Sequence, residues 1–156
     1  MSAQQPDLLK GLTQADADAV LALGAARDIP AGAVLFRLGD AAEAVYLIER
    51  GRLALSLPMR LGGRAQDVVV EEHDAGQTVG WSALIPPHRF TLTATAPLGT
   101  RVLALRRTSL LEFCAVYPRV GYVLSMNIAA VVGQRLQVVQ AMWLREMQRA
   151  VTNAHA

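Results

Sequence analysis

The sequence is poor in cysteine, aromatic residues and lysine. Its single cysteine, Cys114, excludes an internal disulfide framework, and the surrounding LLEFCAVY predicts a buried thiol in a reducing compartment. Only 5% of the residues are aromatic, so the core must consist mainly of alanine, valine and leucine. Lysine occurs once, at Lys10, and the net charge of +2 is too small to indicate nucleic-acid binding.

Long hydrophobic segments are also missing. No stretch reaches the roughly 18 apolar residues of a membrane span. The N-terminus, MSAQQPDLLKGL, lacks the basic and apolar regions of a signal peptide. We therefore expect a cytoplasmic protein without membrane contact. The length of 156 residues predicts a single domain, residues 1–156, with a substantial core.

The residue patterns predict a helix followed by a long β region. A helix is expected over residues 7–24, where Thr13 and Asp16 have the spacing of a capping box. Residues 31–106 contain short apolar runs separated by glycine, aspartate and proline, which indicates many short antiparallel strands in a barrel or sandwich. Within them RLGGRAQD, residues 60–67, predicts a hairpin loop.

Residues 107–150 return to a helical pattern. A short helix ends near Pro118, and about 34 residues without an interior proline follow. A helix of that length cannot bury its apolar side on a small barrel, so we predict a homodimer through it; the alternative is a helix folded back on its own barrel. The apolar residues recur at spacings of three and four: Tyr122, Met126, Ala129, Val132, Leu136, Val139, Trp143 and Met147.

Glycine landmarks within this order of elements carry a resemblance. The sequence LFRLGDAAEAVYLIERGRLAL contains Gly39, Asp40, Tyr46, Ile48 and Gly51; AGQTVGWSALI contains Gly76 and Gly80; RLQVVQ spans residues 135–140. Together they resemble the cyclic nucleotide-binding domain of the catabolite activator (Crp/Fnr-like) family, here without the helix-turn-helix module. The resemblance implies an α+β, mainly β fold: a double-stranded β-helix, or jelly-roll-like β-roll, flanked by an N-terminal helix and a long C-terminal helix.

The resemblance also implies a phosphate cradle at the segment GWSALI. In the family, backbone N–H groups at a short helix bind the phosphate, and a glutamate after the glycine accepts from the ribose 2′-hydroxyl. Trp81 stands at the glutamate position and offers no acceptor. Its ring either stacks on a flat ligand or fills the cavity that holds the nucleotide in the family. The backbone part of the cradle corresponds to Gly80, Ser82, Ala83 and Leu84.

Two further family contacts are altered. The arginine that pairs with the phosphate corresponds to His88 or Arg89. Strand alternation places His88 inward with Phe90, and Arg89 outward with Thr91, unless a bulge after the two prolines reverses them. A Thr-Ser pair that contacts the base in the family corresponds to Val139 and Gln140. Because one to three polar contacts are missing, we predict that cyclic AMP does not bind tightly.

These residues predict a regulatory small-molecule sensor module of the cyclic nucleotide-binding-like type, acting through a dimer or a partner protein. The alternatives are a ligand-free dimerisation or scaffold module, and cyclic mono- or dinucleotide binding by an altered cradle. No cofactor is certain; the candidate effectors are a cyclic nucleotide or another small molecule. Since no recognition helix follows the long helix, we expect no direct nucleic-acid contact.

Catalytic and metal-binding patterns are weak. No nucleophile, base and orienting acid form a recognisable motif, so we expect no enzyme. Glu71, His73 and Asp74 in EEHDAG could ligate a metal, but they do not alternate onto one face. We therefore interpret this segment as a solvated acidic turn between strands.

Overall fold

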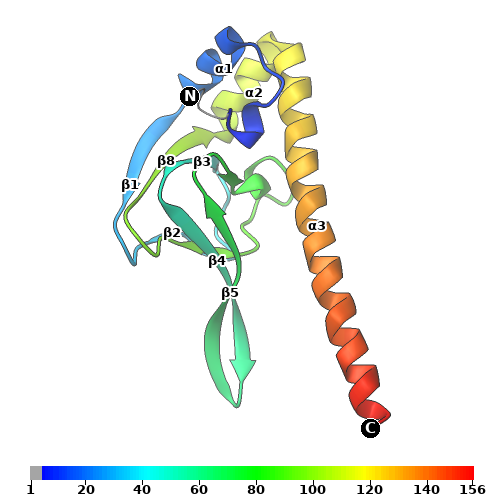
Figure 1. Cartoon of the computed structure of the whole chain (residues 1–156). Coiled ribbons are helices and arrows are strands. Elements are labelled where there is room, and N and C mark those ends of the chain that lie inside the picture. The colour runs from blue at the N-terminus through cyan, green and yellow to red at the C-terminus, as the bar shows by residue number, and fades with distance from the viewer. Residues whose placement is uncertain (1–4) are drawn as a thin grey trace.

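The computed structural model describes residues 5–156 and shows two four-stranded antiparallel sheets (Figure 1). The strand orders are β1-β8-β3-β6 and β2-β7-β4-β5. One hydrophobic cluster joins the strands to buried residues of the flanking helices. The strands are β1 (Ala25–Ile29), β2 (Val34–Phe36), β3 (Ala44–Arg50), β4 (Arg52–Leu61), β5 (Arg64–Asp74), β6 (Thr78–Val79), β7 (Thr93–Thr95) and β8 (Thr100–Arg106).

The N-terminal helical region is shorter than predicted. In place of one helix over 7–24, the chain forms a 3₁₀ helix η1 (Asp7–Leu9) and an α-helix α1 (Gln14–Leu21). Gly11, with a φ of 87°, lies between them in the left-handed region, which ends the first turn. The predicted cap is confirmed: the Thr13 hydroxyl oxygen accepts from the Asp16 amide at 3.2 Å. The β region therefore begins with β1 at Ala25 and not at residue 31, where the sequence pattern placed its start.

The β4–β5 hairpin is also longer than predicted. Leu61 pairs with Arg64, so only Gly62 and Gly63 form the turn, with φ angles of 59° and 79°. Two residues with positive φ match the two-residue turns that follow the natural twist of a hairpin. The loop expected over residues 60–67 is therefore wrong: the strands run to the tip, and the hairpin projects from the roll (Figure 1).

Two helices follow the roll, α2 (Arg107–Val116) and the 37-residue α3 (Pro118–Ala154). Val120, Leu124 and Ile128 are the buried residues of α3, at spacings of four that place them on one face. Gly121 permits the close approach of α2, because a Cβ there would lie 2.9 Å from the Cβ of Cys114.

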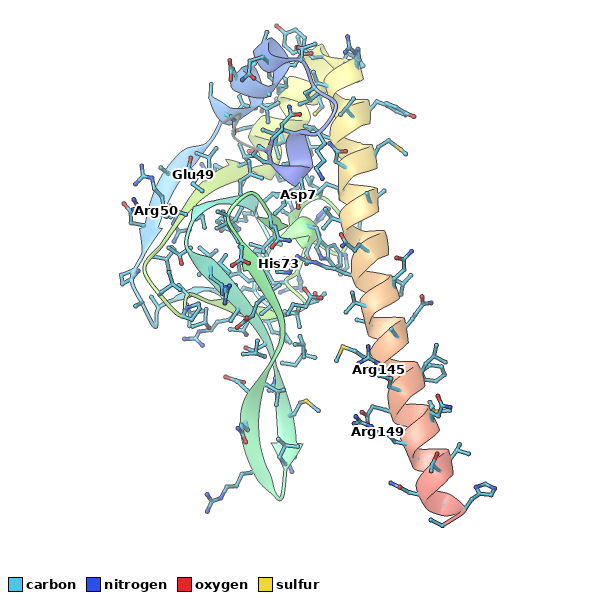
Figure 2. All side chains as sticks on the ribbon, in the orientation of Figure 1. Asp7, Glu49, Arg50, His73, Arg145 and Arg149 are labelled. Atoms are coloured by element: carbon cyan, nitrogen blue, oxygen red, sulfur yellow. The ribbon has the colours of Figure 1, made fainter. Side chains whose placement is uncertain are left out.

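Beyond this packed part, α3 leaves the roll. Every residue from 136 to 156 is exposed, and the helix extends past the barrel (Figure 1). Figure 2 shows Arg145 and Arg149 on this extended part. The alternative of a helix folded back on its own barrel is thus wrong for the distal half. Among the described residues, no helix combines the length and apolar character needed to cross a membrane.

Candidate functional site

The segment GWSALI forms a tight turn against the roll. Gly80 has a φ of 80° and precedes the three-residue 3₁₀ helix η2 (Trp81–Ala83), and Leu84 ends it. This positive φ favours glycine at position 80, where a Cβ would also be tight, 3.2 Å from the Ala44 carbonyl oxygen and 3.3 Å from the Phe90 ring. Ser82 and Ala83 are buried. The backbone of the implied cradle is therefore a single tight turn.

The volume beside this turn is filled by side chains. Phe90 is 5% exposed, and its ring stacks on that of Phe36 with centroids 3.7 Å apart. The remaining cavity is about 10 Å³, at the limit of what one water molecule needs. Its lining brings together five of the predicted site residues and their neighbours: Phe36, Leu55, Gly80, Trp81, Ser82, Phe90, Thr91, Leu92 and Arg135.

The other predicted site residues do not join this lining. Arg89 is exposed, and its guanidinium donates to the Gly39 carbonyl at 2.8 Å. His88 has a φ of 58°, and its Nδ1 lies 3.3 Å from the Ser82 carbonyl oxygen. Strand alternation does not apply to either residue, since β7 begins only at Thr93.

The two base-contact positions on α3 are also remote from the cradle. Val139 is 55% exposed, and Gln140 is exposed beside it. Both belong to the part of α3 that extends past the roll (Figure 1). Within one chain, neither residue contributes to the lining of the small cavity beside η2.

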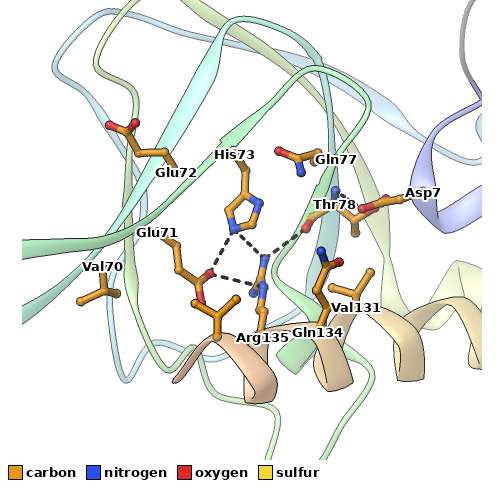
Figure 3. Close-up of a pocket in the computed structure, with 11 residues that line it drawn as sticks. Asp7, Val70, Glu71, Glu72, His73, Gln77, Thr78, Val131, Gln134 and Arg135 are labelled. Atoms are coloured by element: carbon orange, nitrogen blue, oxygen red, sulfur yellow. Dashed lines mark hydrogen bonds and ion pairs between the residues drawn. The ribbon is translucent and has the colours of Figure 1, made fainter. Parts of the chain in front are cut away.

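The sequence interpretation missed the side chain that connects α3 to this region, Arg135. Its side chain is only 14% exposed and also lines the small cavity beside η2. Its Nη2 lies 3.3 Å from the Thr78 carbonyl oxygen and 3.2 Å from His73 Nε2, and its Nε lies 3.4 Å from Glu71 Oε2 (Figure 3). Nε is within ion-pair distance of Glu71 but makes no hydrogen bond among the described residues.

The interpretation of EEHDAG as a solvated turn is wrong for Glu71 and His73. Both lie on β5, two residues apart and so on one face, with side chains only 14% and 15% exposed. The hydrogen bond from His73 lowers the pKa of Glu71, burial opposes this, and the charge of Arg135 lowers it further. Burial in turn lowers the pKa of Arg135. No group of residues suited to hold a metal ion occurs in the described part of the chain.

A cavity of about 240 Å³ lies beside this cluster, between β5, β6, η1 and α3 (Figure 3). Asp7 of η1 closes one side, where its carboxylate accepts from the backbone amide and hydroxyl of Thr78. Val131, Gln134 and Arg135 line it from α3. The sequence did hold a signal for Arg135, since it lies seven residues after the buried Ile128 and so on the same helix face.

The two-sheet roll, the glycine turn before η2 and the long C-terminal helix define a cyclic nucleotide-binding type of fold. Residues 26–117 match the sequence model of the cyclic nucleotide-binding domain, and the chain belongs to this family. The predicted family and β-roll fold are thereby confirmed.

Individual relatives support the same assignment. The cyclic AMP receptor protein of Thermus thermophilus is 28% identical over 130 residues, which are 83% of this chain and 57% of the receptor. The crystal structure of the Thermus thermophilus catabolite activator protein superposes with a TM-score of 0.72 at 26% identity, covering 88% of this chain and 61% of that one. A Neurospora crassa lysophospholipase, nte1, is 31% identical over 102 residues, 65% of this chain but 6% of the enzyme. The chain thus spans little more than half of the receptor and a small part of the enzyme.

Proposed function

We propose that this protein is a regulatory sensor-type module whose family cradle is filled by its own side chains. It does not bind cyclic AMP tightly, and it acts through the orientation of α3 in a homodimer. The single observation that carries this proposal is the cavity of about 10 Å³ beside Phe90 and Trp81. Small-molecule sites are typically on the order of 300–1,000 Å³, so a nucleotide would have to displace packed aromatic rings.

The charges around the cradle support the same conclusion. A phosphate requires an uncompensated donor or cation. Arg135 is the cationic side chain in the lining, and it already faces Glu71 at 3.4 Å. Arg89, the other candidate, is exposed and bonded to Gly39.

Thermal unfolding with and without cyclic nucleotides tests this proposal. A ligand at 100 times its dissociation constant adds about 2.7 kcal/mol of stability, which for a chain of this size raises Tm by roughly 5 to 11 °C. We expect no such shift with cyclic AMP, cyclic GMP or cyclic dinucleotides. The Thermus thermophilus receptor, assayed alongside, serves as the positive control. A shift of several degrees with cyclic AMP would refute the filled cradle.

A second candidate function is binding of another small molecule in the 240 Å³ cavity. Its support is a lining that combines the amides of Gln77 and Gln134, the guanidinium of Arg135 and apolar valines. Such a ligand would bridge the roll and α3. A stability gain that is found in a metabolite screen and disappears in Gln134→Leu would establish this function, while an unchanged gain would place the ligand elsewhere.

The homodimer rests on the exposed apolar side of α3. Leu136, Trp143 and Met147 lie on one helix face and are each about half exposed or more. The same stripe on a second copy is complementary to it through a two-fold axis, which is the simplest way to cover it. A partner protein could read the resulting helix orientation in the cytoplasm, where we predict that the protein acts.

Sedimentation equilibrium tests the dimer. We expect twice the 16.8 kDa mass of one chain for the native protein and for the control Gln137→Arg. Leu136→Arg places a charge at the centre of the stripe and should yield monomers that remain folded by circular dichroism. A native protein that stays monomeric at tens of micromolar contradicts this part of the proposal.

A further inference from the structure

The hydrogen bonds around His73 cannot all form at once. Its Nε2 lies 3.0 Å from Glu71 Oε2 and 3.2 Å from Arg135 Nη2. In a neutral imidazole, Nε2 carries either a hydrogen or a lone pair. It can therefore donate to the carboxylate or accept from the guanidinium, but not both. One of the two close contacts is left without a hydrogen bond in either tautomer.

Protonation of the ring resolves this competition in favour of the carboxylate. An imidazolium donates from Nε2, so it bonds Glu71 through a charge-assisted hydrogen bond and repels Arg135. The other charged groups around the cavity do not replace the lost contact. Asp7 of η1 is bonded to Thr78, and Glu72 points to an ion pair with Arg52 of β4 at 3.6 Å. The single negative charge of Glu71 then lies between two cations, the His73 imidazolium and the Arg135 guanidinium.

The position of Arg135 gives this competition a structural consequence. Arg135 is the last half-buried residue of α3, and all residues after it are exposed. Its contacts with Glu71, His73 and the Thr78 carbonyl are the last polar contacts between α3 and the roll among the described residues (Figure 3). Anything that weakens them loosens the packing of α3 on the roll between the buried Ile128 and Arg135.

We propose that Glu71, His73 and Arg135 form a pH-sensitive latch that holds α3 against β5 while His73 is neutral and loosens when it is protonated. The geometry carries this response, because a protonated imidazole has no lone pair at Nε2 to accept from Arg135. The latch goes beyond the proposed function, since it requires neither a ligand nor a dimer.

Hydrogen exchange of the backbone amides of residues 131–142 tests the latch. Protection of this segment is measured at pH 8.0 and pH 5.5 and corrected for the pH dependence of chemical exchange. In the native protein we expect protection to fall by about two- to tenfold at the lower pH, the loss that one hydrogen bond accounts for. Equal protection at the two pH values would overturn the proposal.

Variants assign the response to one histidine. His73→Gln cannot be protonated, so its protection should not depend on pH, whereas the matched control His88→Gln should behave like the native protein. Should His73→Gln not fold, Glu71→Gln removes the shared carboxylate and should also abolish the response. A response that persists in the folded variant refutes the latch. Because the same response is expected in monomeric Leu136→Arg, failure of the latch and failure of the dimer are distinguishable.

Discussion

Replacement of Phe90 by alanine probes the filled cradle most directly. The ring is 5% exposed, stacks on Phe36 with centroids 3.7 Å apart, and borders a cavity of only about 10 Å³. Removal of a buried phenylalanine ring typically costs about 3–5 kcal/mol, because apolar contacts are lost and the surroundings collapse only in part. In a chain of this length each kcal/mol lowers Tm by about 2–4 °C. We therefore expect Tm to fall by roughly 6 to 20 °C.

Urea and thermal unfolding, followed by circular dichroism, measure this cost. Phe113→Ala on α2 is the matched control, since Phe113 is only partly buried and should cost clearly less. The volume left by Phe90→Ala is apolar, so benzene should restore part of the stability of this variant and leave the native protein unchanged. If Phe90→Ala lowered the free energy of unfolding by less than about 1 kcal/mol, Phe90 would not fill the cradle. The explanation for the small size of the cavity there would then fail.

Two further predictions concern a turn and an acid response. Gly51 has a φ of 94°, and a Cβ there would lie 2.5 Å from Thr100 Oγ1 and 2.8 Å from the Gly99 carbonyl oxygen. Gly51→Ala should therefore lower the free energy of unfolding, measured in urea, by more than about 2 kcal/mol. The pKa of Glu71 is lowered in the folded state, chiefly by the hydrogen bond from His73. The ionised Glu71 side chain therefore stabilises the fold fully above the unfolded carboxyl pKa of about 4.3. This stabilisation is lost as pH falls through the lower folded pKa. Glu71→Gln should therefore lose less stability than the native protein between about pH 5 and pH 3; equal losses would contradict the lowered pKa.

Local signals in the sequence predicted which helices and strands occur better than they predicted where these begin and end. The spacing of Thr13 and Asp16 predicts a cap that the structure contains, whereas the single helix predicted over 7–24 is interrupted at Gly11, whose φ is positive. Likewise, the segment RLGGRAQD predicts a hairpin, but only Gly62 and Gly63 form its turn, and the polar residues around them belong to the strands. Those residues are exposed because the hairpin projects from the roll, and not because they lack strand structure.

The candidate site was predicted only in part, because its decisive contacts are long-range. Gly80, Trp81 and Ser82 were found from a local motif. Strand alternation assigned His88 inward, but the chain before β7 is irregular, so alternation carries no information there. Arg135 contacts Glu71 across 64 positions of sequence, and no local pattern of the segment EEHDAG reveals that partner.

The length of α3 converts small movements at its base into large ones at its end. At about 1.5 Å per residue, the segment from Arg135 to Ala154 reaches roughly 28 Å from the last polar contact with the roll. A tilt of about 5° at that contact would displace the tip by about 2.5 Å, close to half the pitch of a helical turn. The contacts of Arg135 with the roll therefore set the position of a helix end that lies far from them.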